Sequence, residues 1–320
     1  MSAIHHKAIN PAEKASFVAA MDLGTNSNRL LIADANGKAV FRDVRHVALG
    51  DGLAENGCFS ELSMERAICS FMDFATVMET YHVQKYRAIA TAACRMSHNT
   101  PELIAEIAKM SHINLEVISE FEEARLTLLG ARLNAPQDKK YLFVYDLGGG
   151  STEITLATNE AHPSILHTIS IPLGARNATE IFNLADYHPK EARELENTVK
   201  KYLTRFLEQI QSINYQNHTA LIATSSTPLR LASWLAKHPV YDKFAADGLS
   251  VSTQDLDSLI TTVLQMNWQQ RADSPYVGPN RAGIFVAALV IFRTIYHALG
   301  AQTLVASLKG AQEAIIREIL

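Results

Sequence analysis

The chain has 320 residues, which is enough for two domains at a typical size of about 150 residues each. Its 29 lysines and arginines and its 33 aspartates and glutamates give a net charge of −4, and 48% of its residues are hydrophobic. This composition excludes an intrinsically disordered chain, and the acidic excess argues against a dedicated DNA-binding protein. We therefore expect no nucleic acid partner.

The sequence shows neither a membrane-spanning segment nor a secretory signal. The most hydrophobic stretch, residues 283–292, is far shorter than the roughly 20 residues that a helix needs to cross a bilayer. The cysteines are odd in number and lack the CxxC spacing of a zinc site; they are Cys58, Cys69 and Cys94. We therefore expect a cytoplasmic protein with reduced thiols and no membrane partner.

Hydrophobic periodicity predicts a first half in the order β-β-β-α-β-α-β-α. It begins with a hairpin over residues 17–32 and a third strand over 38–49. The five elements that follow alternate between helix and strand and cover residues 61–81, 86–91, 101–110, 115–119 and 122–133.

The second half repeats this order, starting with a hairpin over residues 142–156 and a third strand over 164–173. The expected helices cover residues 189–213, 228–236, 253–266, 280–299 and 311–320. The two further strands are expected over 220–224 and 302–306. Such a repeat predicts an α/β fold of two domains, each with a mixed sheet, and a cleft between them.

The two hairpins share a motif, which supports an internal repeat. Its four positions recur at one offset of 124 residues: Asp22, Leu23, Gly24 and Ser27 return as Asp146, Leu147, Gly148 and Ser151. The polar stretch around residues 134–140 then separates a first domain, 1–134, from a second, 135–307. The sequence leaves open whether the C-terminal helix, residues 308–320, completes the first domain.

The turn of each hairpin is a candidate site for an anion. Gly148, Gly149 and Gly150 expose successive backbone N–H groups, and the hydroxyls of Ser151 and Thr152 add further donors. The equivalent turn of the first domain comprises Gly24, Thr25, Asn26 and Ser27. Two plain hairpins are the alternative, but two copies that each follow an aspartate at a strand end favour a pair of phosphate-binding turns.

Carboxylates flank the second turn at Asp146 and Glu153. Negative charges beside a phosphate site are costly unless a cation is present, so we expect hydrated Mg²⁺ to bridge protein and substrate. Asp22, at the matching strand end of the first domain, completes the candidate metal set. The alternative is that these side chains are solvated acids of ordinary turns.

These motifs resemble the exopolyphosphatase/guanosine-pentaphosphate phosphohydrolase (Ppx/GppA) family of the superfamily that contains actin, Hsp70 and sugar kinases. The matching segments are A-x-D-L-G-T-N-S-x-R-L-L at 20–31, R-x-V-x-L-G-x-G-L at 45–53, A-T-A-A-x-R-x-x-x-N at 90–99, I-S-x-x-E-E-A-R-L at 118–126, D-L-G-G-G-S-T-E at 146–153 and I-P-L-G-A at 171–175. The resemblance implies two ribonuclease-H-like domains with an interdomain cleft.

The resemblance also implies roles for individual residues. Glu123 would act as the base on the attacking water, Asp146 and Glu153 would serve metal and water, and Arg95 would contact phosphate. The implied function is a Mg²⁺-dependent hydrolase that releases terminal phosphate from inorganic polyphosphate. The alternatives are hydrolysis of pppGpp, or a polyphosphate or alarmone sensor with little turnover. Whether the chain forms a homodimer stays open.

The second half departs from the family pattern. Ser225-Ser226-Thr227 stands where the family usually has a glycine pair before Thr, and Arg281-Ala-Gly283 replaces Arg-Ala-Asp. In the first half, Glu120 replaces a glycine. The glycine pair lets the backbone approach a nucleoside in related kinases, so its loss argues against nucleotide binding. The catalytic set is unaffected.

Overall fold

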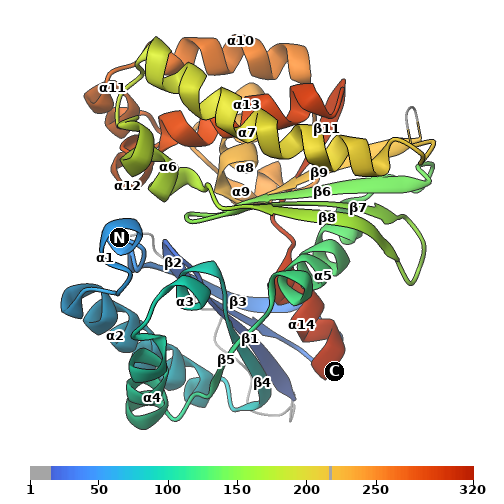
Figure 1. Ribbon diagram of the computed structural model, residues 1–320. Helices are drawn as coiled ribbons and strands as arrows, with labels where there is room; N and C mark the ends of the chain where they lie inside the picture. Colours follow the sequence, from blue (N-terminus) through green and yellow to red (C-terminus); the bar gives the residue numbers. More distant parts are fainter. Residues whose placement is uncertain (1–15, 216–217) are drawn as a thin grey trace.

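The computed structural model describes residues 16–215 and 218–320, which form two α/β units, each built on one mixed sheet (Figure 1). The first sheet has the strand order β3-β2-β1-β4-β5. Its first three strands are antiparallel, and β4 and β5 add to β1 in parallel. The bounds are β1 (Phe17–Leu23), β2 (Ser27–Ala33), β3 (Ala39–His46), β4 (Val83–Ala90) and β5 (Leu115–Val117).

The second sheet repeats this topology. Its order is β10-β11-β9-β6-β7-β8, so β8-β7-β6-β9-β11 copies the first sheet and β10 is an added antiparallel edge strand. The bounds are β6 (Tyr141–Leu147), β7 (Thr152–Thr158), β8 (Ile165–Ile171), β9 (Thr219–Thr224), β10 (Ser250–Ser252) and β11 (Thr303–Ser307). The predicted fold of two ribonuclease-H-like domains is confirmed.

The helices follow the expected order, with short additions. In the first half they are α1 (Leu53–Asn56), α2 (Glu61–Thr80), α3 (Ala92–Met96), α4 (Thr100–Ser111), α5 (Glu120–Ala131) and the 3₁₀ turn η1 (Arg132–Asn134). In the second they are α6 (Ala175–Phe182), α7 (Pro189–Ile210), α8 (Ser226–Leu235), α9 (Lys243–Ala246), α10 (Thr253–Leu264), α11 (Trp268–Asp273), α12 (Pro279–Ala282), α13 (Phe285–Ala298) and α14 (Ala311–Ile319).

The predicted helix over residues 280–299 is wrong in one respect, because the chain divides it into α12 and α13 at Gly283 and Ile284. The sequence also missed α1, α3, α6, α9 and α11. Most of these have six residues or fewer, which is too short for a hydrophobic period to develop.

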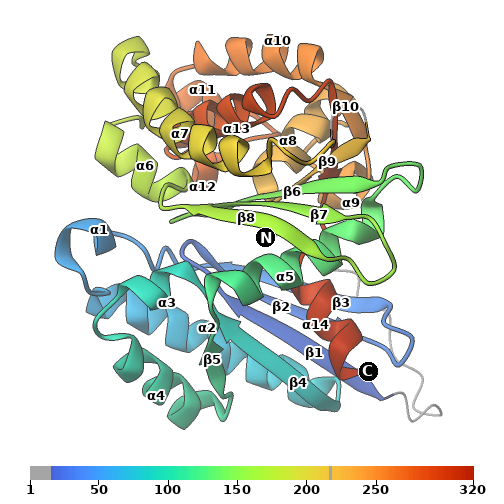
Figure 2. The same cartoon turned by 45° about the vertical axis from the view of Figure 1, so that its right-hand side comes forward.

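Helix α5 lies between the two sheets (Figure 2). Its residue Leu126 packs with α14 against the first sheet, whereas Leu128 and Ala131 pack against Leu142 of the second. The outer face of the first sheet is covered by α2 and α4, and that of the second sheet by helices that include α7, α10 and α13. The central strands of each sheet are therefore buried on both faces, and α5 is shared between the two cores.

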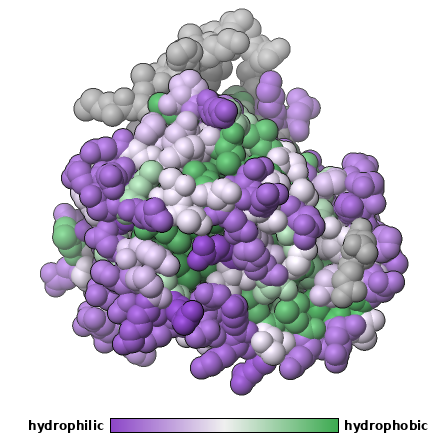
Figure 3. Space-filling model, turned by 90° about the horizontal axis from the view of Figure 1, so that it is seen from above, coloured by the Kyte–Doolittle hydropathy of each residue, from purple (hydrophilic) through white to green (hydrophobic). Residues whose placement is uncertain are grey.

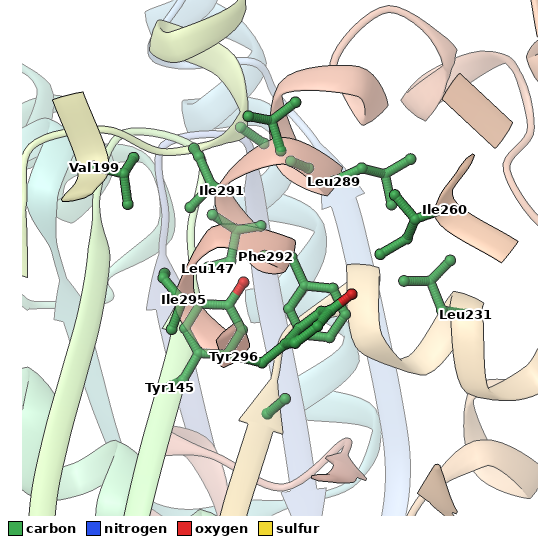
Figure 4. Packing of buried hydrophobic residues seen from close by; sticks show 14 of the residues in the cluster. Tyr145, Leu147, Val199, Leu231, Ile260, Leu289, Ile291, Phe292, Ile295 and Tyr296 are labelled. Carbon is green, nitrogen blue, oxygen red and sulfur yellow. The ribbon is translucent and has the colours of Figure 1, made fainter. Parts of the chain in front are cut away.

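The core of the second unit positions the end of β6 (Figure 4). The ring of Tyr145 stacks on Phe292 of α13 with a centroid distance of 5.5 Å, and Phe292 meets Tyr296 edge-on at 5.2 Å. Aromatic pairs in these geometries add to the stabilisation that burial itself supplies. Strand β6 is thereby held one residue before Asp146.

The outer face of the second unit, seen in Figure 3, carries many hydrophilic residues with smaller groups of hydrophobic ones between them.

No helix in the described part of the chain is long and apolar enough to span a membrane.

The C-terminal helix α14 returns to the first sheet. Gln312 donates from Nε2 to the carbonyl of Ala20 at 2.9 Å, and Glu313 pairs with Arg42 of β3 at 2.5 Å. Just before α14, Gly310 passes so close to α5 that a Cβ on Gly130 would lie 1.8 Å from the Gly310 carbonyl oxygen. The chain end is thus packed against the helix that both sheets share.

We predict that Gly130→Ala destabilises the protein by about 2 kcal/mol or more, because the added methyl group meets backbone that cannot rotate away. Urea unfolding followed by circular dichroism measures this. The control is Gly283→Ala, where φ is −75° and the nearest atom to the new Cβ is 3.5 Å away. Equal midpoints for the two variants would contradict the prediction.

Candidate active site

The site begins with one residue at the same place in each sheet. Side chains alternate along a strand, so Met21 and Tyr145 point into the helix-covered cores while Asp22 and Asp146 point to the faces on which α5 packs. The two aspartates therefore face the same interdomain space. Their antiparallel partners are Arg29 for Asp22 and Glu153 for Asp146.

At the position that pairs with the aspartate, the two copies of the repeat carry side chains of opposite charge. Arg29 and Glu153 are separated by the same 124 residues as Asp22 and Asp146, so they occupy matching positions in the two hairpins. Arg29 Nη1 lies 3.6 Å from Asp22 Oδ2, whereas Glu153 stands next to another acid. Negative charge therefore gathers on the second unit and is partly balanced on the first.

Helix α5 supplies the third acidic position. Ser119 caps the helix by accepting a hydrogen bond from the Glu122 N–H at 3.2 Å, which fixes the first turn. Glu123 lines the interdomain cleft and binds Arg95 Nη1 at 2.8 Å. Glu122 points away and pairs with Arg87 and Arg125. The two neighbouring glutamates therefore face different surroundings.

The electrostatic consequences differ between these glutamates. Burial, and to a smaller degree the charges of Asp22 and Asp146, raise the pKa of Glu123 to about 7 against the opposing effect of Arg95. Burial and the charge of Glu123 raise the pKa of Glu153 to about 8. The arginine partners of Glu122, by contrast, lower its pKa to about 2.

The pKa values of the two aspartates are shifted in the same direction as that of Glu123. Burial raises the pKa of Asp22 and of Asp146, and for Asp22 the charge of Asp146 adds to this. Asp22 Oδ1 is also buried without a hydrogen-bond partner in the described part of the chain. Four acidic groups are therefore held where their charged forms are unfavourable.

The two turns are in contact with each other. Gly149 and Gly150 pack directly on the first turn: a Cβ on either glycine would lie 3.1–3.2 Å from atoms of Thr25. The carbonyls of Gly148 and Gly149 accept hydrogen bonds from the first N–H groups of α6, at 2.9 and 2.8 Å. Because the peptide is planar and trans, the N–H groups of the same peptide units point away from α6.

Arg176 of α6 ties the two turns together. Its backbone N–H binds the Gly149 carbonyl at 2.8 Å, and its side-chain Nε binds Asn26 Oδ1 at 3.2 Å. The guanidinium also pairs with Asp51, which follows β3. One residue of the second unit thus fixes the position of the first turn relative to the second.

Two adjoining cavities form the cleft. The smaller, of about 70 Å³, is lined by both turns and by all four acidic groups. The larger, of about 270 Å³, shares several of these residues and continues toward α9 and α14. Of the candidate residues, the smaller cavity is lined by Asp22, Gly24, Thr25, Asn26, Ser27, Glu123, Asp146, Gly148, Gly149, Ser151 and Glu153.

Three candidates do not line the cleft. The expectation that the Thr152 hydroxyl adds a donor is wrong, because this side chain is fully buried and donates to the Leu173 carbonyl at 2.6 Å. Gly150 packs against Thr25. Arg95 lies behind Glu123, where it also binds the Ile118 carbonyl at 3.0 Å, so in this structure it orients an acid rather than facing the cleft.

The model of the Ppx/GppA phosphatase family matches residues 31–320. The chain belongs to this family. The resemblance of its motifs is therefore confirmed, and membership makes it a hydrolase of the phosphatase class.

Individual relatives agree with this assignment. Exopolyphosphatase 2 of Mycobacterium tuberculosis is 28% identical over 294 residues, which are 88% of this chain and 90% of the relative. A bifunctional 3-dehydroquinate synthase/phosphatase of Fusobacterium nucleatum is 26% identical over 305 residues, and this chain spans 44% of that longer protein.

Solved structures show the same fold. An exopolyphosphatase-like protein superposes with a TM-score of 0.86 at 26% identity, covering 96% of this chain and 98% of that one. An exopolyphosphatase from Cytophaga hutchinsonii has a TM-score of 0.86 at 22% identity, with 95% and 97% covered.

The sequence analysis missed most of the cations that line the larger cavity. Arg230, Lys243 and Arg281 line it, and in the described residues none of them lies within ion-pair distance of an acid. Burial, then the charges of Arg230 and Arg29, lower the pKa of Arg281 to about 9. Only Arg29 could have been found from the sequence, by applying the repeat offset to Glu153.

The acidic groups offer ligand atoms that could hold a divalent cation. All the donors are carboxylate oxygens, and the unpartnered Asp22 Oδ1 is an available ligand atom. Within the described ranges, no three His, Cys, Asp or Glu residues gather closely enough to enclose a metal by themselves. Mg²⁺ suits such a site, because it usually keeps several waters and takes only one or two carboxylates together with substrate phosphates.

We predict that the acidic cluster makes the protein less stable as pH rises from about 6 to about 8.5. A carboxyl group whose pKa is raised in the folded state binds its proton more tightly there than in the unfolded chain, so stability is lost as pH passes the folded pKa. For Glu123 and Glu153 these values are about 7 and about 8. Thermal unfolding should give a lower Tm at the higher pH, and MgCl₂ should restore it.

The matched variant is Glu153→Gln, which removes one titrating group from the cluster. His46, whose pKa is lowered mainly by burial, acts in the opposite direction, but it does so in both proteins. The fall in Tm should therefore be smaller in the variant than in the parent. A variant with the same or a larger fall would show that the cluster does not control this dependence.

Proposed function

We propose that the protein is a Mg²⁺-dependent exopolyphosphatase, which hydrolyses the terminal phosphoanhydride bond of inorganic polyphosphate. The observation that supports this most directly is the distribution of charge along one continuous cleft. All four acidic groups that can hold a metal line the smaller cavity, and Asp22, Glu123 and Asp146 also line the larger one. The larger cavity adds Arg230, Lys243 and Arg281, which form no ion pair in the described residues. A chain of phosphates matches both parts, with its terminal group among the acids and its following groups among the cations.

The chemical step needs positioning and a base more than it needs covalent catalysis. The terminal phosphoryl group would lie between the two turns, within reach of their backbone N–H groups. Water attacks its phosphorus, the bond to the bridging oxygen breaks, and the departing chain keeps the electron pair. Glu123 takes the proton from the water, and its pKa of about 7 suits a base that works near neutral pH.

Other residues support this step. Arg95 would hold Glu123 in place through its 2.8 Å contact. When bound, Mg²⁺ would neutralise charge on the phosphate oxygens, and Asp22, Asp146 and Glu153 are the residues available to hold it.

The lining of the larger cavity favours a bare phosphate chain over pppGpp. Tyr241 is the only aromatic residue among those that line the two cavities in the described structure. The Arg230 guanidinium lies over its ring, 4.1 Å from the centroid. A purine would need an open aromatic face on which to stack, and this ring already has a cation on one face.

We expect Glu123→Gln to lower kcat by about 100-fold or more, because the amide keeps the shape of the side chain but cannot accept the proton. Release of phosphate from polyphosphate measures the effect. The matched control is Glu122→Gln on the same helical turn, which loses ion pairs with Arg87 and Arg125 outside the cleft. Equal losses in both variants would remove Glu123 from the role of base.

We expect phosphate release to need Mg²⁺, and polyphosphate to be hydrolysed with a kcat/KM at least about tenfold above that for pppGpp. Asp146→Asn should raise the Mg²⁺ concentration for half-maximal rate, since a neutral oxygen binds this cation less well. The control is Glu55→Gln on the exposed surface of α1. Faster turnover of pppGpp would favour the pentaphosphate hydrolase, and binding of either compound without turnover would favour the sensor.

A further inference from the structure

Ser225 has a backbone conformation that side chains rarely adopt. It follows β9 directly, with φ at 86° and ψ at 178°, and its neighbour Thr224 pairs with Asp146 in the sheet. This region of φ and ψ is favourable only for glycine, and other residues persist in it when the surrounding structure imposes it, often at functional sites. The strain therefore lies one residue beyond the strand position that faces the acidic cluster.

The hydroxyl of Ser225 has no structural use in the described chain. Ser225 stands at the N-cap of α8, where a serine usually accepts a hydrogen bond from the first turn, but its side chain makes no such bond. Its Oγ is buried and has no hydrogen-bond partner in the described structure. A buried hydroxyl without a hydrogen-bond partner is unfavourable. Ser225 therefore destabilises the protein twice, through its backbone conformation and through its hydroxyl.

The surroundings of Ser225 are suited to an anion. Ser225 lines both cavities and therefore lies where they join. Arg281 also lines both, and Arg230 lines the larger one; neither pairs with an acid in the part of the chain that the structure describes. Arg230 binds two carbonyls through Nη1, but its Nε is buried without a partner. The other residues that line both cavities are the donors Ser27, Arg29, Thr91 and Ser226 and the acids Asp22, Glu123 and Asp146. Donors therefore outnumber acids at this junction.

We propose that Ser225, with Arg281 and Arg230, forms a subsite for the second phosphoryl group of the substrate, the group that leaves when the terminal phosphate is removed. This assignment rests on the proposed function. The Ser225 hydroxyl donates a hydrogen bond to a non-bridging oxygen of that group. As the bond between the terminal phosphorus and the bridging oxygen breaks, that oxygen keeps the electron pair, and donors fixed beside the group stabilise its growing charge.

The backbone strain makes a test with two independent readouts possible. Ser225→Gly removes the hydroxyl and relieves the strain, so the Tm should rise by about 2 °C or more. Ser225→Ala removes the hydroxyl and keeps the strain. In both variants, tripolyphosphate should bind about tenfold more weakly, as measured by calorimetry in a Glu123→Gln background, and kcat for polyphosphate should fall by about tenfold in the otherwise unchanged chain.

Lys237→Gly is the matched control at the other end of α8. Lys237 is exposed, lies outside both cavities and has φ at 56°, so glycine should relieve strain there as well. The control should raise the Tm while leaving tripolyphosphate binding unchanged.

The proposal is overturned if both Ser225 variants bind tripolyphosphate as tightly as their parent. It is likewise overturned if the control weakens binding as much as they do. If the parent protein fails to hydrolyse polyphosphate while the Ser225 variants still lose tripolyphosphate affinity, the proposed function fails and the anion subsite stands.

Discussion

The burial of four carboxyl groups at one place is the constraint on which the rest of the structure depends. Asp22 and Asp146 come from different sheets and Glu123 from the helix between them, and burial raises the pKa of each. Such a group of acids would separate unless the backbone held it in place. The holding elements are rigid: β1 and β6 are central strands, and α5 packs on both sheets. The packing of the hydrophobic cores on either side offsets the unfavourable free energy of burying these acids.

If the protein is the proposed exopolyphosphatase, the same arrangement explains how a chain with a net charge of −4 can receive a polyanion. The global charge repels phosphate weakly, but fields inside a cleft are set by the nearest groups. Arg230, Lys243 and Arg281 line one cavity, and in the described residues none of them lies within ion-pair distance of an acid. Burial first, and then the charges of neighbouring arginines, lower the pKa of Arg281 and of Lys243, so their charged forms are unfavourable there. An anion between them relieves that cost, and a divalent cation does the same for the acids.

The internal repeat made most of the fold predictable from the sequence. One offset of 124 residues fixed the two hairpins and put Asp22 and Asp146 at matching strand ends, and the sheets follow the implied order. The same offset, applied to the second strand of each hairpin, shows that Glu153 occupies the position that matches Arg29. A repeat carries this information because equivalent positions in equivalent hairpins must face the same side of their sheets.

Other parts of the site could not be predicted, because they depend on contacts between distant segments. The Thr152 hydroxyl is used by the Leu173 carbonyl, and only the path of the chain after β8 brings that carbonyl near. Lys243 lies on the four-residue helix α9, which shows no periodicity. The sequence did carry one signal for the strain at Ser225, because this serine stands where the family usually has a glycine, and its φ of 86° is one that glycine adopts easily.

The contact between the two turns bears on which end of a substrate can react. Thr25 packs on Gly149 and Gly150, and Arg176 bridges the turns, so the two units are joined at the smaller cavity. The larger cavity extends the other way, toward α9 and α14. In the proposed exopolyphosphatase, a phosphate chain would enter through the larger cavity, past its cations, and reach the acidic groups of the smaller one. The two turns, which contact each other beyond these acids, block its further path. Only its terminal group then reaches Glu123. Attack at the chain end is thus a consequence of where the two repeats touch, and it needs no separate recognition of the end.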